Sequence, residues 1–121
     1  SPIDTSALEG KVVLISYWAT WCEPCVEEMD RLQKLREKYS KAGFEIVGVC
    51  LDHDKGKAVE FLREKGYGWP QMYEEGAMES KLATDLGIIS LPYLILVDAN
   101  GNVVNKNVQF GELEAELAKV M

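Results

Sequence analysis

Two cysteines, Cys22 and Cys25, lie two residues apart at the point where an apolar run gives way to a helix. The run at residues 12–17 is rich in β-branched residues and predicts a buried strand. Pro24 suits the first turn of a helix, where its missing N–H costs little. Two cysteines with this spacing at a helix start can close a small disulfide ring. The pair therefore constrains the fold, a strand leading directly into a helix, as well as the chemistry.

Thiol–disulfide exchange is the chemistry that this position favours. The unpaired N–H groups and partial positive charge of a helix N-terminus stabilise a thiolate. Cys22 is therefore predicted to be the nucleophile, because the thiolate is the form that attacks a disulfide. Cys25 lies one turn further along the helix, within reach to resolve a mixed disulfide. The alternative is a chance pair of buried structural thiols, which the preceding strand and the internal proline make less favoured.

Residues inside and beside the pair are expected to adjust its redox properties. Pro24 stiffens the loop, and Glu23 places a carboxylate beside the thiolate, which should oppose thiolate formation modestly. We assign both to tuning of the redox potential and expect a reducing protein. Trp21 offers an aromatic surface at the mouth of the pair, either for packing or for recognising a substrate.

Glu28 is a candidate for proton transfer. Cys25, Met29 and Leu32 share one face of the predicted helix, and Glu28 falls within that apolar arc, whereas Glu27 falls on the opposite side. A carboxyl group in apolar surroundings favours its protonated form. Glu28 could then shuttle the proton that Cys25 must lose or gain. The alternative is that its side chain bends out to water.

The rest of the chain alternates between strands and helices. Strands are predicted at 44–51, 94–97 and 102–105, and helices at about 24–41, 54–65, 80–86 and 112–120. Asp52 or Asp54 could cap the second helix. The alternation predicts parallel pairing with right-handed crossovers, and a tight turn near residue 100 predicts one antiparallel edge. We therefore expect an α/β fold, a mixed central sheet with helices on both faces, in a single domain spanning residues 1–121.

Composition excludes several other functions. The net charge of −7 disfavours nucleic acid and anionic lipid as partners. No apolar run approaches the roughly 20 residues that a membrane span needs. Cys50 lies in an apolar strand and is expected to be buried and inert. The chain has three cysteines and one histidine, and no two pairs of these residues have the spacing of a metal site. We therefore expect no bound metal and no cofactor besides the disulfide.

Two stretches resemble the TlpA/ResA-like branch of the thioredoxin superfamily, with its AhpC/TSA-type thioredoxin-like domain. One is residues 10–15 followed by Tyr-Trp-Ala-Thr-Trp-Cys-Glu-Pro-Cys, and the other is residues 86–98 with the Asn-Gly turn after them. The resemblance implies a thioredoxin-like fold with an insertion after the second strand, at about 52–78. It also implies that Cys22 is the exposed nucleophile and Cys25 the buried resolving thiol.

The second stretch implies a substrate-binding edge. Pro92 would have a cis peptide bond and face the disulfide, and the Leu91 backbone would pair with an extended substrate. Tyr93 follows the proline where Thr is more usual, which widens the surface and leaves the substrate preference open. Glu28 matches an acidic position that several family members carry.

The resemblance also implies a location and partners. Family members are mostly exported, face the outside of the cell membrane and are often tethered to it, so a bacterial periplasm or envelope location is expected. They reduce disulfides in protein or peptide substrates, a role in cell redox homeostasis, with electrons from a membrane thiol–disulfide protein. The chain begins at Ser1 without Met, which fits the C-terminal domain of a longer exported protein.

Two other functions remain open. A peroxiredoxin-like peroxidase would need Thr three residues before its cysteine, whereas Thr20 precedes Cys22 by two. A thioredoxin-like peptide-binding module or redox sensor would use the Pro92 surface without catalysis. The intact cysteine pair argues against a module without redox chemistry.

Overall fold

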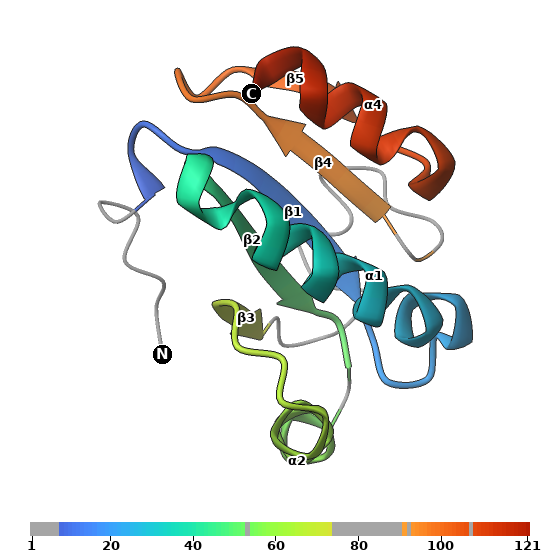
Figure 1. The fold of residues 1–121 in the computed structure, drawn as a ribbon. Helices are drawn as coiled ribbons and strands as arrows, with labels where there is room; N and C mark the ends of the chain where they lie inside the picture. The colour runs from blue at the N-terminus through green and yellow to red at the C-terminus, as the bar shows by residue number, and fades with distance from the viewer. Residues whose placement is uncertain (1–7, 53, 74–90, 92, 107) are drawn as a thin grey trace.

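The computed structural model describes residues 8–52, 54–73, 91, 93–106 and 108–121. Within them, five strands form one sheet in the order β3-β2-β1-β4-β5 (Figure 1). The strands are β1 (Val12–Trp18), β2 (Phe44–Cys50), β3 (Gln71–Tyr73), β4 (Tyr93–Val97) and β5 (Val103–Lys106). The helices are α1 (Glu23–Tyr39), the 3₁₀ turn η2 (Ser40–Ala42), α2 (Lys55–Lys65) and α4 (Phe110–Val120). The mixed α/β sheet that the sequence predicts is confirmed.

The first crossover joins β1 to β2 through α1. The two strands are parallel, and their register runs from Val12 opposite Phe44 to Trp18 opposite Cys50. Gly43 has a φ of +96°, a conformation that glycine adopts without steric cost, and its N–H donates to the carbonyl of Ser40. The predicted stop before β2 is therefore confirmed, although the last residues before it form the 3₁₀ turn η2.

The second crossover joins β2 to β3 through α2. Asp54 caps this helix, because its side chain accepts a hydrogen bond from the N–H of Lys57 at 3.1 Å. Gly66 ends it in the left-handed conformation. β3 then pairs in parallel with β2 and forms one edge of the sheet. The sequence indicates only a short extended piece here, because three residues carry too little pattern to identify a strand.

The other half of the sheet is antiparallel. β4 pairs antiparallel with β1, and β5 pairs antiparallel with β4. The sequence predicts the hairpin between β4 and β5 but only one antiparallel edge. The direction of β4 relative to β1 depends on the connection between β3 and β4, and residues 74–90, with the predicted helix at 80–86, lie outside the described residues.

The main core lies between one face of the sheet and the helices α1, α2 and α4, and Figure 1 shows α1 lying across the sheet. Alternate strand residues supply this face, as expected for pleated strands. Residues of the opposite face form a second, smaller cluster. Both cysteines of the pair belong to the main core cluster, whose larger members include Leu14, Trp18, Met29, Leu32, Phe44, Ile46, Leu94, Leu96, Leu113 and Leu117. The redox pair is therefore anchored in the packed interior.

Among the described helices, none is long and apolar enough to cross a membrane.

Candidate functional site

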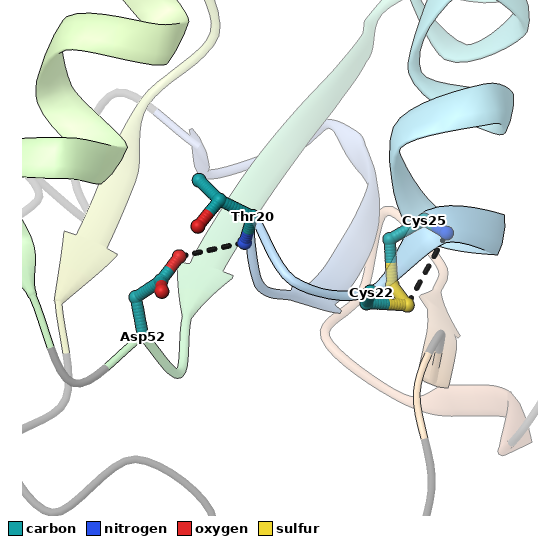
Figure 2. Close-up of a disulfide and its surroundings, with 4 residues drawn as sticks. All are labelled: Thr20, Cys22, Cys25 and Asp52. Atoms are coloured by element: carbon teal, nitrogen blue, oxygen red, sulfur yellow. Dashed lines mark hydrogen bonds between the residues drawn. A yellow bond between two sulfur atoms is a disulfide. The ribbon is translucent and has the colours of Figure 1, made fainter.

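Cys22 and Cys25 form a disulfide at the N-terminus of α1, with their Cα atoms 5.3 Å apart. Cys22 is the N-cap residue of α1, in an extended conformation, and its Sγ accepts a hydrogen bond from the N–H of Cys25 at 3.2 Å (Figure 2). Pro24 occupies the first turn of the helix, as the sequence predicts. The helix N-terminus thus directs an N–H group at the sulfur, which is the arrangement that stabilises a thiolate.

Both cysteines of this disulfide are buried. Cys22 is 4% exposed and Cys25 is 2% exposed. The resemblance implies an exposed Cys22, and the structure differs because Cys22 packs within the main core cluster. Trp21, by contrast, is 56% exposed and presents a large apolar surface next to the disulfide. The position of Trp21 is compatible with its predicted role in substrate binding, which stays a prediction.

Glu23 and Pro24, the two residues between the cysteines, are both exposed on the first turn of α1. They lie between the two disulfide cysteines, a position compatible with their predicted role. Their assignment to tuning of the redox potential stays a prediction.

The loop between β1 and Cys22 is a tight turn. The N–H of Cys22 donates to the carbonyl of Ala19 at 3.1 Å and closes the turn. The N–H of Thr20, inside it, donates to Oδ2 of Asp52 at 2.6 Å (Figure 2). Asp52 follows β2, so its carboxylate reaches across from the neighbouring strand. The sequence leaves open whether Asp52 or Asp54 caps α2, and the structure assigns the cap to Asp54.

The sequence did not predict this contact of Asp52 with Thr20. One signal could have indicated it: the carboxyl ends of neighbouring parallel strands meet at one edge of the sheet. A polar residue directly after β2 therefore lies beside the loop that follows β1.

Glu28 lies on α1 one turn beyond Cys25, and its side chain is 20% exposed. Its Oε2 atom lies 3.2 Å from Nη1 of Arg31, an ion pair without hydrogen-bond geometry, and the same oxygen is shielded from solvent. The side chain is thus neither fully in the core nor free in water, which are the two alternatives that the sequence leaves open. Glu27 is exposed, as the helical periodicity predicts. The role of Glu28 in proton transfer stays a prediction.

The start of β4 lies at the same edge of the sheet as the disulfide. Tyr17 pairs with Tyr93 in the antiparallel register, and their rings meet edge-to-face with centroids 5.9 Å apart. Leu91 is partly buried and packs against the core cluster that contains both cysteines. Pro92 lies outside the described residues, so its predicted cis bond and contact with the disulfide stay predictions.

Cys50, the third cysteine, is 1% exposed. Burial raises the pKa of its thiol to about 12, which keeps the thiol protonated at neutral pH. The sequence predicts a buried, inert cysteine here, and the structure confirms its burial. Among the described residues, no group of three or more His, Cys, Asp or Glu side chains could hold a metal ion.

A mixed sheet with a disulfide at the strand-to-helix junction defines a thioredoxin-like protein. The Redoxin family model matches residues 1–120, and the chain belongs to that family. The predicted superfamily and fold are therefore confirmed.

Curated relatives carry names that match the predicted chemistry. The chain is 32% identical over 104 residues to the thiol-disulfide oxidoreductase ResA of Bacillus thuringiensis, covering 86% of this chain and 58% of that protein. It is 36% identical over 93 residues to the thiol:disulfide interchange protein DsbE of Escherichia coli, covering 77% and 47%. The chain thus spans about half the length of these relatives.

Solved structures agree with the fold over most of the chain. A thiol-disulfide oxidoreductase from Bacteroides fragilis superposes with a TM-score of 0.83 at 25% identity, covering 93% of this chain and 83% of that one. The thioredoxin domain of a thiol-disulfide oxidoreductase from Bacteroides vulgatus superposes with a TM-score of 0.83 at 26% identity, covering 98% and 86%. The described strands and helices thus belong to a fold that these oxidoreductases share.

Proposed function

We propose that this chain is a protein thiol–disulfide oxidoreductase that acts as a disulfide reductant through Cys22 and Cys25. The observation that carries the proposal is the disulfide at the N-terminus of α1, where the N–H of Cys25 points at Sγ of Cys22. A helix N-terminus lowers the free energy of a thiolate at this position once the disulfide is reduced. The names of the relatives support the same chemistry.

The proposed reaction transfers two electrons to a substrate disulfide. In the reduced chain, the Cys22 thiolate attacks one substrate sulfur, forms a mixed disulfide and releases the first substrate thiol. Cys25 then loses its proton and attacks Sγ of Cys22, which closes the ring and releases the second substrate thiol. The first substrate sulfur leaves as a thiolate and takes a proton from solvent, which balances the proton that Cys22 gave up on ionising, and the second substrate sulfur takes the proton that Cys25 loses, relayed through Glu28. Glu28 is the proposed acceptor of the proton that Cys25 loses.

The substrate would be a protein or peptide that lies along the edge formed by Trp21, Leu91, Pro92 and Tyr93. Trp21 is exposed next to the disulfide, and Leu91 packs against the core cluster that holds both cysteines. An extended peptide can add to such an edge through backbone hydrogen bonds. Glu23 and Pro24, which are exposed between the cysteines, would tune the redox potential.

We also propose that the chain works outside the cytoplasm, as one thioredoxin-like domain of an envelope protein that is tethered to the membrane. A membrane thiol–disulfide protein would return it to the dithiol state. The oxidised Cys22–Cys25 pair is the form that such a donor would reduce. No metal or further cofactor takes part in the proposed reaction, since the dithiol itself carries the electrons.

A disulfide-reduction assay tests the proposal. The pre-reduced chain should reduce insulin disulfides, and Cys22→Ser should lower the rate by at least about 100-fold because it removes the nucleophile. Cys25→Ser should instead trap a mixed disulfide with the substrate, which is visible on a non-reducing gel. Lys119→Ala is the control, because the Lys119 side chain is 70% exposed on α4, and it should leave the rate within about twofold.

Three outcomes would contradict the proposal. An inactive wild-type chain would favour a peptide-binding module or redox sensor. Peroxide consumption without any disulfide substrate would favour a peroxidase. A mixed disulfide formed through Cys25 in the Cys22→Ser variant would reverse the two roles. The reduction potential, measured against glutathione, decides between a reductant and an oxidant.

A further inference from the structure

Asp52 joins two parts of the molecule that are far apart in sequence. Its Oδ2 atom accepts the N–H of Thr20 at 2.6 Å, and the two residues are 32 positions apart. Thr20 lies two residues before the disulfide, on the turn that Cys22 closes by donating to the carbonyl of Ala19. Figure 2 shows the Asp52 side chain reaching this turn from one side, while the disulfide lies at its other end.

The Thr20 N–H has no other acceptor among the described contacts. The residue is only partly exposed, and the hydrogen bond that closes the turn, from Cys22 to Ala19, does not involve the Thr20 N–H. A shielded N–H without an acceptor is costly, and a carboxylate is a strong acceptor. The Asp52 side chain therefore supplies the hydrogen-bond acceptor that the turn itself does not provide for the Thr20 N–H.

The same oxygen has a second neighbour that helps to orient it. Sγ of Cys50 lies 3.8 Å from Oδ2 of Asp52 as a weak donor. Because burial raises the pKa of Cys50 to about 12, this thiol keeps its proton at neutral pH and can donate it to the carboxylate. The Asp52 oxygen is thus held between the end of β2 and the turn that precedes Cys22.

We infer that Asp52 is a positioning residue for the redox pair: its hydrogen bond to the Thr20 backbone holds the turn that places Cys22 against Cys25. The inference rests on the proposed function, because it concerns the stability of the same disulfide. Ring closure depends on the effective concentration of one thiol at the other, which falls when the segment carrying Cys22 loosens. Without the Asp52 acceptor, the disulfide is easier to reduce.

The test measures the equilibrium constant of the Cys22–Cys25 disulfide against glutathione. Asp52→Ala should lower the constant for ring closure by about fivefold, as expected for the loss of one hydrogen bond. Asp52→Asn keeps a side-chain oxygen for the Thr20 N–H and should stay within about twofold of the wild type. Asp54→Ala is the matched control, because it removes the same charge two residues away, at the cap of α2.

Amide hydrogen exchange supplies a second measurement that does not depend on a variant. In the wild-type protein the Thr20 amide should exchange at least about tenfold more slowly than an open turn amide. Asp52→Ala should remove that protection, and Asp52→Asn should retain most of it.

Four results would overturn the inference. They are an unprotected Thr20 amide in the wild type, an unchanged equilibrium in Asp52→Ala, an equal shift in Asp52→Asn, or an equal shift in Asp54→Ala. An equal shift in Asp52→Asn would mean that the charge of Asp52 acts rather than its hydrogen bond. Failure of the proposed function is distinguishable from all four, because the wild-type pair would then not cycle between dithiol and disulfide at all.

Discussion

The indole N–H of Trp18 donates a 2.9 Å hydrogen bond to the side-chain oxygen of Gln71, which lies 53 positions later in the chain. Trp18 ends the strand that leads to the disulfide, and Gln71 begins the edge strand after α2. Gln71 lies opposite Gly48 in the parallel register, and a Cβ atom at Gly48 would collide with the Gln71 side-chain amide. Because Gly48 has no side chain, the Gln71 side chain has the room to reach Trp18.

We expect Gly48→Ala to displace the Gln71 side chain and break its hydrogen bond to Trp18. The free energy of unfolding should fall by about 1–2 kcal/mol, because the indole N–H then loses its acceptor. Urea denaturation checks this value. Gly111→Ala is the control, since nothing lies within 4 Å of a Cβ at that position, and it should not destabilise the protein. Equal destabilisation by both changes would contradict the role of Gly48.

Glu28→Gln should change how the reactivity of Cys25 depends on pH. The substitution keeps the size of the side chain but removes its ability to accept the proton of Cys25. The measurement is the rate of resolution of a Cys22 mixed disulfide across a pH series. The neighbouring exposed residue provides the control, because Glu27→Gln removes the same charge from the opposite side of α1. If the two variants share one profile, Glu28 has no special role in proton transfer.

Cys50 should not react with thiol reagents in the folded protein. Since burial raises its pKa to about 12, almost no thiolate exists at about pH 8. The reduced, folded chain should therefore show two reactive thiols, and the denatured chain should show all three cysteines. Fast labelling of Cys50, the one cysteine left in the folded Cys22→Ser, Cys25→Ser double variant, would show that this thiol is accessible.

The raised pKa of Cys50 also makes the stability depend on pH. The folded protein keeps the thiol proton in a pH range where the unfolded chain has lost it, so this contribution is complete below about pH 9. It is then lost as the pH rises from the ordinary thiol value of 9.0 toward about 12. The free energy of unfolding of the wild type should therefore fall relative to that of Cys50→Ala as the pH rises across this interval. A constant difference would contradict the raised pKa.

The ion pair between Arg36 and Glu45 should stabilise the packing of α1 on β2. Nε and Nη2 of Arg36 contact the two carboxylate oxygens at 2.8 and 3.3 Å, and both side chains are largely covered. Arg36→Ala should lower the free energy of unfolding by about 1–2 kcal/mol in a urea titration. The more exposed pair of Lys119 with Glu116 is the comparison. Lys119→Ala should change the free energy of unfolding by less than about 0.5 kcal/mol. A larger loss from Lys119→Ala would reverse this ranking.

Local signals were enough to predict much of the fold and the centre of the site. The apolar strand before Cys22, Pro24 in the first turn of α1, and the glycine that ends the next segment each act within a few residues. Such signals are visible in sequence because propensity, capping and side-chain periodicity depend on near neighbours. The burial of Cys50 was predicted for the same reason, from the apolar strand that contains it.

Contacts between distant segments were not predictable in this way. The choice between Asp52 and Asp54 as the cap of α2 could not be made from sequence, because both precede the helix by a few residues. Their roles separate only when β2 lies beside β1 and brings Asp52 to the Thr20 N–H. The partial burial of Glu28 likewise depends on how α1 packs on the sheet, whereas its contact with Arg31, three residues along the same helix, is local.

By itself the sequence determined that a strand enters a helix at two cysteines able to form a ring, because these features are encoded within about one turn of chain. Only the tertiary structure decided that the ring is covered, that β4 runs antiparallel to β1, and that Asp52 holds the turn before Cys22. These depend on strand pairing and side-chain packing between segments tens of residues apart. A linear pattern does not specify such distances, since they arise when the sheet assembles.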